Sequence, residues 1–367
     1  MRFRQFQNIW IKKSLHDITK KINIKNKNKE CKNAICNSAQ LGLIKQIDFF
    51  DKEIARDGSI KNYTIIKKND FVYNPRKSLN APYGPVNIYN YEEAGIVSPL
   101  YLCFSVHDID KIFLHYYFKS QVWYRFIYLN GDSGARHDRV SIKDEVFFSQ
   151  SLYLPNAIEQ EKIGVFLTLI DQRIDTQNKI IEDLELFKNR ISYQIFFKMN
   201  AENIVSLGEI ASIYQPKTIS QFDFKNNGAF NVYGANGIIG KYDKYNHEDS
   251  EILLSCRGNC GTVNMSMPKS WINGNAMVIH IKIPNINKKF TYYYLQNINF
   301  KTLISGSGVP QITRKPVENI KVKIPCKEDQ IFITNIIDCI YLKIKKEKDI
   351  LELYKKQKAY LLKNMFI

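Results

Sequence analysis

Two long amphipathic stretches constrain this chain more than any other feature of its sequence. One covers residues 154–196 and the other residues 324–366. Aligned without gaps at an offset of 170, Leu154-Pro155 meets Ile324-Pro325, and Phe196 meets Phe366. In both stretches an acidic residue follows the Pro within one turn, which is typical of a helix N-terminus. The sequence therefore predicts two matched helices.

The apolar residues of both stretches recur in alternating steps of four and three, which is the pattern of a coiled-coil seam. Polar residues interrupt both seams at equivalent places, first at Gln177 and Glu347 and then at Lys188 and Lys358. The seam positions are Ile163, Leu167, Ile170, Ile174, Ile181, Leu184, Ile191 and Ile195 in the first stretch, and Ile333, Ile337, Ile340, Ile344, Leu351, Tyr354, Leu361 and Met365 in the second. We expect the two helices to pack on each other as an antiparallel coiled coil.

The repeat continues upstream of the helices, because residues 13–18 (KSLHDI) resemble residues 205–210 (VSLGEI). The chain is thus predicted to alternate between globular domains and helices, with a pseudo-twofold tandem repeat. The predicted boundaries are 1–153 and 201–323 for the globular domains, and 154–200 and 324–367 for the helices. The domain interiors differ in length and sequence, so we expect them to match only at their edges.

Each globular domain is predicted to be a small α+β domain, with a twisted β-sheet, helices and long loops. In the first domain, strands are expected at 63–67, 70–74 and 95–106, and a helix at 108–127. In the second, strands are expected at 251–259 and 275–282, and a helix at 289–305.

Positive charge is concentrated in the globular domains. The chain has 53 Lys and Arg against 36 Asp and Glu, a net charge of +17. Residues 158–196 contain five basic and seven acidic residues, and residues 327–366 contain nine and six, so the helices carry only +1 and the remainder +16. A gene of Lys-rich codon usage explains part of this excess. The rest favours a polyanionic partner, of which nucleic acid is the leading candidate.

Other classes of protein are disfavoured by what the sequence lacks. The first 20 residues have no continuous apolar core of a signal peptide, and no run of about 18 apolar residues is present. We therefore expect a cytoplasmic protein without a membrane span. The seven Cys are odd in number and lack zinc-finger spacing, which favours reduced thiols over disulfides or a metal site.

Several loops of the globular domains mix basic, amide and aromatic residues, as DNA-reading loops do. Arg can bind guanine, and Asn or Gln can bind adenine, through two hydrogen bonds in the major groove. Lys suits the phosphates, which position a protein without specifying sequence. Taken singly, each of these residues is more often an ordinary surface residue. The candidate DNA contacts are Lys67, Lys68, Tyr73, Asn74, Arg76, Tyr83, Arg136, His137, Arg139, Lys217, Tyr233, Arg257, Asn259, Lys269, Gln311 and Arg314.

A search for catalytic motifs finds none with the required spacing. GANGIIG (234–240) lacks the spacing of a dinucleotide-binding loop, and neither a GxxxxGK[ST] loop nor an HExxH motif is present. Asn74-Pro75-Arg76 departs at its third position from the tetrapeptide of amino-methyltransferases. His137-Asp138 has no evident nucleophile nearby. We therefore expect a non-catalytic chain.

The order of domains, the paired Leu-Pro…Gln and Ile-Pro…Gln helix starts, and the Lys…Phe helix ends resemble the specificity subunit of type I restriction–modification enzymes. Local matches include DFVYNPR (70–76), GARHDRVSI (134–142), RGNCG (257–261) and GSGVPQITRKPVENIKVKIP (306–325). The resemblance covers essentially the whole chain. It is specific for the architecture and unspecific for individual DNA contacts.

This resemblance implies a subunit in which each globular domain recognises half of an asymmetric, bipartite DNA target. Two adenine-N6 methyltransferase subunits would bind S-adenosylmethionine, and two restriction subunits would use ATP and Mg²⁺, while this chain binds no cofactor directly. The helices would act as a spacer and docking surface, with Gln160, Lys188, Gln330 and Lys358 as candidate residues beside the seam. The alternatives are a two-domain DNA-binding regulator that dimerises through a coiled coil, and a fused nuclease–methyltransferase, which the missing motifs disfavour.

Overall fold

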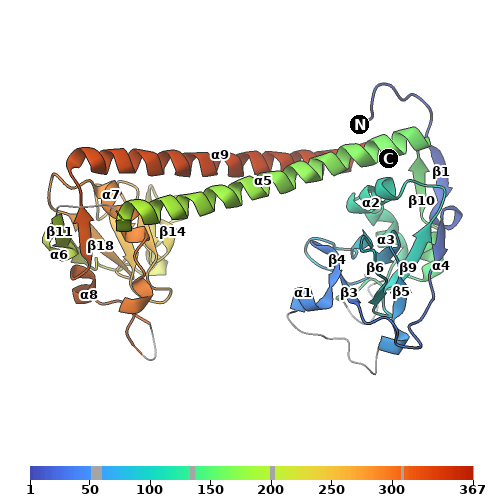
Figure 1. The fold of residues 1–367 in the computed structure, drawn as a ribbon, viewed down its shortest axis with the longest axis horizontal. Coiled ribbons are helices and arrows are strands. Elements are labelled where there is room, and N and C mark those ends of the chain that lie inside the picture. Colours follow the sequence, from blue (N-terminus) through green and yellow to red (C-terminus); the bar gives the residue numbers. More distant parts are fainter. Residues whose placement is uncertain (51–59, 133–136, 199–202, 307–309, 367) are drawn as a thin grey trace. The chain divides into compact units, whose positions relative to one another are not determined.

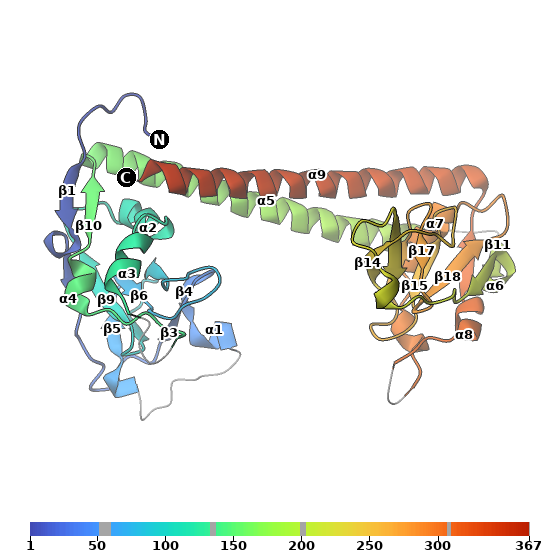
Figure 2. The same ribbon diagram turned by 180° about the vertical axis from the view of Figure 1, so that it is seen from behind.

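The protein is an α+β chain that divides into two compact units (Figures 1 and 2). The computed structural model describes residues 1–50, 60–132, 137–198, 203–306 and 310–366. Unit 1 comprises Met1–Asn178 and Ile350–Ile367, and unit 2 comprises Lys179–Asp349. Each unit therefore contains one globular part and a section of both long helices. No helix in the described ranges is long and apolar enough to cross a membrane.

The described residues of unit 1 form two four-stranded sheets and a two-stranded ladder. The sheets have the strand orders β2-β9-β6-β7 and β4-β3-β8-β5, and β1 pairs with β10. Its elements in chain order are β1 (Ile11–Ser14), η1 (Leu15–Asp17), β2 (Thr19–Lys21), β3 (Ala34–Ser38), β4 (Gly42–Lys45), α1 (Gln46–Phe50), η2 (Ile60–Asn62), β5 (Thr64–Ile66), β6 (Phe71–Tyr73), β7 (Val86–Ile88), β8 (Gly95–Val97), β9 (Leu102–Val106), α2 (Lys111–Lys119), α3 (Tyr124–Asn130), α4 (Asp144–Phe148), β10 (Ser151–Leu154) and the start of α5 (Ala157–Lys198).

In unit 2, the described residues form a four-stranded sheet, a three-stranded sheet and a two-stranded ladder. The sheets have the orders β12-β18-β15-β16 and β14-β13-β17, and β11 pairs with β19. Its elements after the end of α5 are β11 (Asn203–Ser206), α6 (Leu207–Ile210), β12 (Ala211–Tyr214), η3 (Gln221–Asp223), β13 (Phe230–Gly234), β14 (Gly237–Tyr242), β15 (Ile252–Ser255), β16 (Val263–Met265), β17 (Trp271–Ile272), β18 (Ala276–Ile281), α7 (Lys288–Gln296), η4 (Phe300–Leu303), α8 (Arg314–Glu318), β19 (Lys321–Ile324) and the start of α9 (Lys327–Met365).

The same topology occurs in both units, although their sequences differ. The order β2-β9-β6-β7 of unit 1 matches β12-β18-β15-β16 of unit 2, and all these pairs are antiparallel. In the second sheets, β3 and β8 pair in parallel, as do β13 and β17. The sequence suggested that the domains match only at their edges. The structure shows that the strand order is shared in the interiors as well, because different apolar residues satisfy the same pairing.

The short repeated motif KSLHDI/VSLGEI has a local structural cause. In both units a two-stranded ladder leads into a capped turn, and the ladders have the same register at offsets of 192 and 170 residues. The backbone N–H of Ser14 donates to the Asp17 carboxylate over 2.8 Å, and that of Ser206 donates to the Glu209 carboxylate over 3.3 Å. The backbone hydrogen bond from Ser14 lowers the pKa of Asp17, and the side-chain and backbone hydrogen bonds from Ser206 lower the pKa of Glu209. A Ser followed by an acid three residues later is the capping-box pattern.

The ends of the long helices are part of the two hydrophobic cores. In unit 1, the ring of Phe366 lies 5.3 Å from that of Phe113 and 6.1 Å from that of Tyr117. In unit 2, Phe196 lies 5.6 Å from Phe290, and the Tyr294 ring is equally close. Both helix-end Phe residues are buried. The matched Phe at residues 196 and 366 therefore anchors each long helix at its C-terminal end.

Within each unit, the sections of α5 and α9 run antiparallel to each other. In unit 1, Asp171 forms an ion pair with Lys358, and the Arg173 guanidinium lies over the Tyr354 ring at 4.7 Å. In unit 2, Glu185 pairs with Lys348 over 2.6 Å, and Lys188 lies over Tyr341 at 5.0 Å. All the predicted seam residues are buried or half-buried. Gln177 and Glu347, the first polar interruptions, are buried as well.

Three predicted elements prove to be divided. The expected strand at 95–106 is β8 and β9 separated by a turn, in which Tyr101 N–H donates to Ser98 C=O. The expected helix at 108–127 is α2 and α3, because Ser120 ends α2. The expected helix at 289–305 is α7 followed by η4, which Asn299 caps by accepting from Lys301 N–H. In each case a short polar side chain satisfies backbone groups and ends the element.

The half-buried imidazole of His115 predicts that unit 1 loses stability in acid. Burial, aided by the nearby charges of Lys119 and Lys358, lowers the pKa of His115 to about 3. An unfolded chain would protonate this side chain near its ordinary pKa of about 6.5, so native stability present above that pH is lost as the pH falls toward 3. Because His115 keeps partial solvent contact, we expect a loss of about 1–2 kcal/mol between pH 8 and pH 5.

The measurement is denaturant unfolding of His115→Phe and its parent at both pH values. A Trp271→Phe background leaves Trp10 and Trp123, both buried in unit 1, as the fluorescent probes. His115→Phe should show a smaller acid-induced loss of unfolding free energy than the parent. Identical losses in both proteins would contradict the prediction.

Candidate nucleic-acid interface

Two basic segments predicted to read DNA lie side by side in unit 1. They are residues 74–78, which follow β6, and residues 137–140, which follow α3; together they are called loop pair 1. Arg76 and Arg139 form an antiparallel bridge. The backbone N–H of Lys77 donates to Asp138 C=O over 2.8 Å, and that of Val140 donates to Pro75 C=O over 2.9 Å. Backbone hydrogen bonds thus hold two arginines in one small area.

Unit 2 brings together the equivalent segments. Residues 256–261 follow β15, the counterpart of β6, and lie against described residues of the segment 305–312; these segments are called loop pair 2. Arg257 and Gln311 form an antiparallel bridge. Gly258 N–H donates to Pro310 C=O over 3.3 Å, and Ile312 N–H donates to Cys256 C=O over 3.0 Å. The two units therefore present corresponding loop pairs with different side chains.

The exposed side chains of these loops can reach a ligand from solvent. Arg257, Asn259 and Gln311 are exposed in loop pair 2, as are Arg76 and His137 in loop pair 1, whereas Arg139 is half-buried. Asp138 lies 3.9 Å from the Arg76 guanidinium and 3.8 Å from that of Arg139. Exposed ion pairs of this kind contribute little stability, so they can open when a phosphate or base replaces the carboxylate.

The other predicted lysines and arginines lie apart from the loop pairs or are paired within the protein. Lys67 and Lys217 are exposed. Lys68 pairs with Glu92, Lys269 with Glu248 over 3.6 Å, and Arg314 with Glu318 over 2.6 Å. These surface pairs leave the cations near solvent, where they suit phosphate contacts. Arg136 lies outside the described residues.

In the structure, the side chains of three predicted DNA contacts are buried within the protein. Tyr73 is 2% exposed, stacks on Phe147 and donates its hydroxyl to Tyr83 C=O, and burial raises its pKa. Tyr233 is 5% exposed, and its hydroxyl accepts from Met267 N–H. Asn74 is 9% exposed and hydrogen-bonds only to backbone groups at both ends of its amide. Tyr83 is half-buried, with its ring 5.1 Å from that of Tyr124.

Apolar side chains that sequence reasoning missed surround loop pair 1. A pocket of about 250 Å³ beside Arg76 and Arg139 is lined by Phe49 and Phe50, whose rings meet edge-to-face at 4.6 Å. Leu79, at the adjacent tight turn, is 99% exposed. Aromatic and apolar side chains of this kind stack on bases or contact thymine methyl groups. In the sequence, these apolar residues have polar neighbours: Phe49-Phe50 lies between Asp48 and Asp51, and Leu79 lies between Ser78 and Asn80.

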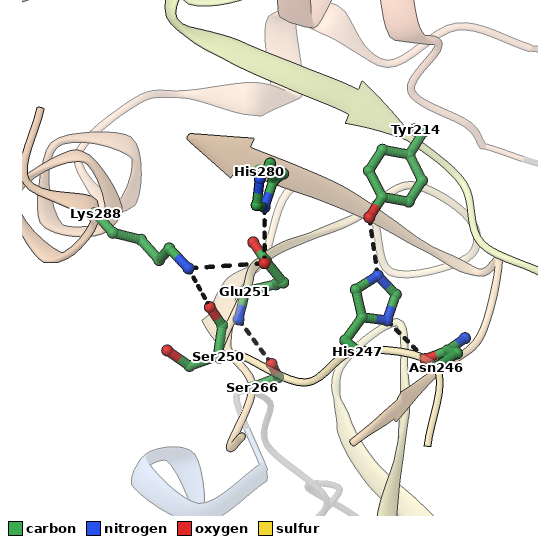
Figure 3. A network of polar contacts seen from close by, with 8 residues as sticks. All are labelled: Tyr214, Asn246, His247, Ser250, Glu251, Ser266, His280 and Lys288. Carbon is green, nitrogen blue, oxygen red and sulfur yellow. Dashed lines mark hydrogen bonds and ion pairs between the residues drawn. The ribbon is translucent and has the colours of Figure 1, made fainter. Parts of the chain in front are cut away.

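A separate polar cluster in unit 2 serves the fold (Figure 3). The Glu251 carboxylate is buried at the start of β15, and it accepts from His280 Nδ1 over 2.8 Å and lies 3.7 Å from Lys288 Nζ. Nearby, the Tyr214 hydroxyl and His247 Nε2 are 2.9 Å apart. The Glu251 contacts join the start of β15 to β18 and α7, and the Tyr214 contact joins β12 to the loop before β15. Among the residues that the structure describes, no group of three or more His, Cys, Asp or Glu could hold a metal ion.

The candidate residues of the long helices are used inside the units. Gln160 is 6% exposed; its carbonyl accepts from Asp110 N–H over 2.9 Å, and its amide donates to Pro155 C=O. Gln330 is 1% exposed and repeats this arrangement with Asn287 N–H and Pro325 C=O. Asp110 and Asn287 in turn cap α2 and α7. Each Gln is therefore buried and fixes the start of a short helix against a long one.

The remaining predicted spacer and docking residues of the long helices fall into two groups. Lys188 and Lys358 are half-buried and contact the other long helix within their own unit, as described above. The apolar candidates face the cores or the helix pair; Ile163, Leu167, Ile170, Ile333, Ile337 and Ile344 are buried, and Ile174 and Ile340 are half-buried.

Comparison with known proteins finds a similarity to one family. Residues 201–354 match the family model described as type I restriction modification DNA specificity domain. A putative type I restriction enzyme specificity subunit of Haemophilus influenzae is 30% identical over 118 residues, which is 31% of this chain and 30% of that protein. The chain is therefore similar to type I restriction enzyme specificity subunits. The chain spans only part of the curated proteins that it matches, from 30% to 56% of the length of three of them.

Solved structures of specificity subunits share the fold. The S subunit of a type I restriction–modification system from M. genitalium has a TM-score of 0.59 and 19% identity, covering 100% of this chain and 99% of that one. A chain from work on complex assembly and conformational transition of the type I R-M system has a TM-score of 0.65 and 13% identity, with coverage of 98% and 97%.

Proposed function

We propose that this chain is the non-catalytic DNA-recognition subunit of a type I restriction–modification complex. In this role it reads an asymmetric, bipartite target and docks adenine-N6 methyltransferase subunits in the cytoplasm. The observation that carries the proposal is the presence of equivalent loop pairs with different side chains, Arg76 with Arg139 in unit 1 and Arg257 with Gln311 in unit 2. Equivalent positions suit two readers of the same kind, and different side chains suit two different half-sites.

The long helices are proposed to set the distance between the half-sites. We propose that they pair as an antiparallel coiled coil with pseudo-twofold symmetry, so that the unread spacer has a defined length. The seam supports this proposal, because its polar interruptions at Gln177 and Glu347 would fix the register of such a pair.

The same helices are proposed as the docking surface for two methyltransferase subunits. Large apolar side chains are exposed on both helices, including Ile158, Val165 and Leu169 on α5 and Phe332 and Leu353 on α9. Exposed apolar residues of this kind favour a protein partner over water. The methyltransferase subunits would bind S-adenosylmethionine, and two restriction subunits would bring ATP and Mg²⁺, so no cofactor is assigned to this chain.

The test of the proposed function is a map of N6-methyladenine in the genome of the source cell, with and without this gene. We expect one asymmetric two-part motif to lose its methylation on deletion. An unchanged map from a cell that expresses the protein would overturn the proposal and would favour a DNA-binding regulator that dimerises through its helices.

Single arginine substitutions should separate the two half-sites. Arg76→Ala should weaken discrimination at one base of the first half-site, and Arg257→Ala should do so in the second, by about 1–3 kcal/mol each. The measurement is the methylated fraction at the target and at its single-base variants. Lys355→Ala, which removes a positive charge from α9, is the control and should leave both half-sites unchanged. Equal loss in both halves from either variant would contradict independent reading.

Lengthening the helices should lengthen the spacer alone. One heptad inserted at equivalent places in α5 and α9 keeps the seam in register and adds about 10 Å to each helix. At about 3.4 Å per base pair, the methylated motif should gain about three unread base pairs between unchanged half-sites. A motif with altered half-sites and an unchanged spacer would contradict the role of the helices as a spacer.

A further inference from the structure

A chain of buried amides runs through unit 1 beneath loop pair 1. Asn37, on β3, is 5% exposed, and Asn87, on β7, is 1% exposed. The side-chain amide nitrogen of Asn87 donates to the side-chain oxygen of Asn37 over 2.5 Å. The side-chain amide nitrogen of Asn37 donates to the backbone C=O of Val72 over 2.7 Å. Buried amides must have such partners, because an unpaired buried polar group is destabilising.

One end of this chain of amides reaches Arg76 in loop pair 1. The Asn74 amide donates to the backbone C=O of Asn37 over 3.1 Å, and the Asn74 carbonyl oxygen accepts from the backbone N–H of Arg76 over 3.0 Å. The Asn74 side chain therefore fixes the backbone of Arg76 by a hydrogen bond, and a second hydrogen bond fixes Asn74 to Asn37. The Arg76 side chain stays exposed.

The other end is a lysine on the helix that packs against α5. Lys119, in the last turn of α2, donates from Nζ to the Asn87 side-chain oxygen over 2.7 Å. Burial lowers the pKa of Lys119 to about 8. In the same helix, the Tyr116 hydroxyl donates to Asp171 of α5 over 2.8 Å. The amide chain thus links α2, which contacts the long helix α5, to the backbone of Arg76.

Unit 2 lacks the counterpart of this chain. Strand register makes Asn264 the equivalent of Asn87, and helix position makes Gln296 the equivalent of Lys119. Gln296 donates to Tyr292 and to the backbone of Val263. The Asn264 side-chain nitrogen is buried without a hydrogen-bond partner. Among the described residues, the amide chain is therefore a feature of unit 1 alone. The shared topology does not require these buried, hydrogen-bonded amides, because unit 2 has the same strand order without them.

We propose that Lys119, Asn87 and Asn37 are positioning residues that set base specificity in the first half-site by holding Arg76 in place. None of the three needs to touch DNA. A bidentate contact between arginine and guanine depends on the direction of the guanidinium, so a small shift of the Arg76 backbone reduces discrimination. This inference rests on the proposed function.

The test is Lys119→Met in the full chain with the partner subunits of the source cell. Methionine keeps the length of the side chain and removes the donor to Asn87. The methylated fraction is measured at the target and at every single-base variant of both half-sites. We expect discrimination at one base of the first half-site to fall about fivefold or more, while the second half-site changes less than about twofold. Lys119→Gln, which introduces the residue that unit 2 carries, should change the first half-site in the same direction.

Two controls separate positioning from loss of stability. Ile18→Val removes one methylene from the unit 1 core away from the amide chain, and it should lower methylation evenly without changing base preference. Gln296→Met makes the equivalent change in unit 2 and should leave the first half-site unchanged. Unchanged preference in both Lys119 variants, equal change in both half-sites, or the same change from Ile18→Val would overturn the inference. Failure of the proposed function itself is distinguishable, since the wild-type gene would then produce no methylated motif.

Discussion

The insertion of one phenylalanine from the end of each long helix into a hydrophobic core is the contact on which the rest of the structure depends. Phe366 packs on Phe113 and Tyr117, and Phe196 packs on Phe290 and Tyr294. Truncating a buried Phe typically costs about 3–5 kcal/mol, so these contacts are strong local anchors. Because α5 begins in unit 1 and ends in unit 2, and α9 does the reverse, each core is completed by a helix that starts in the other unit.

This anchoring explains why the helices are matched while the domain interiors are not. The residues that join a helix to a core must meet equivalent partners in both units, and Gln160 and Gln330 do so with the starts of α2 and α7. The loop pairs lie at the ends of equivalent strands and carry no such requirement. Their side chains can differ while the strand order stays the same, which is the arrangement expected of a scaffold with two independent readers.

Sequence reasoning predicted correctly the parts of the structure in which apolar residues recur at a regular spacing. The seams of the two helices repeat over many turns, and the residues placed on them are buried or half-buried. The capped turns at Ser14 and Ser206 also have a sequence signature. Single loop residues have none. Tyr73 and Tyr233 each have polar residues nearby in the sequence, yet both are core residues. Alternation within a three- or five-residue strand is too short to show which face is buried.

The sequence by itself determined that the chain has two matched helices, a basic charge in its globular parts and no recognisable catalytic motif. Helical periodicity and net charge are properties of the residues alone, so they can be read without coordinates. Only the tertiary structure decided that Arg76 lies beside Arg139, that Arg257 lies beside Gln311, and that Lys119 connects to Arg76 through buried amides. These partners are separated by tens of residues and meet because strand pairing brings their loops together, and strand pairing is set by packing of the whole unit.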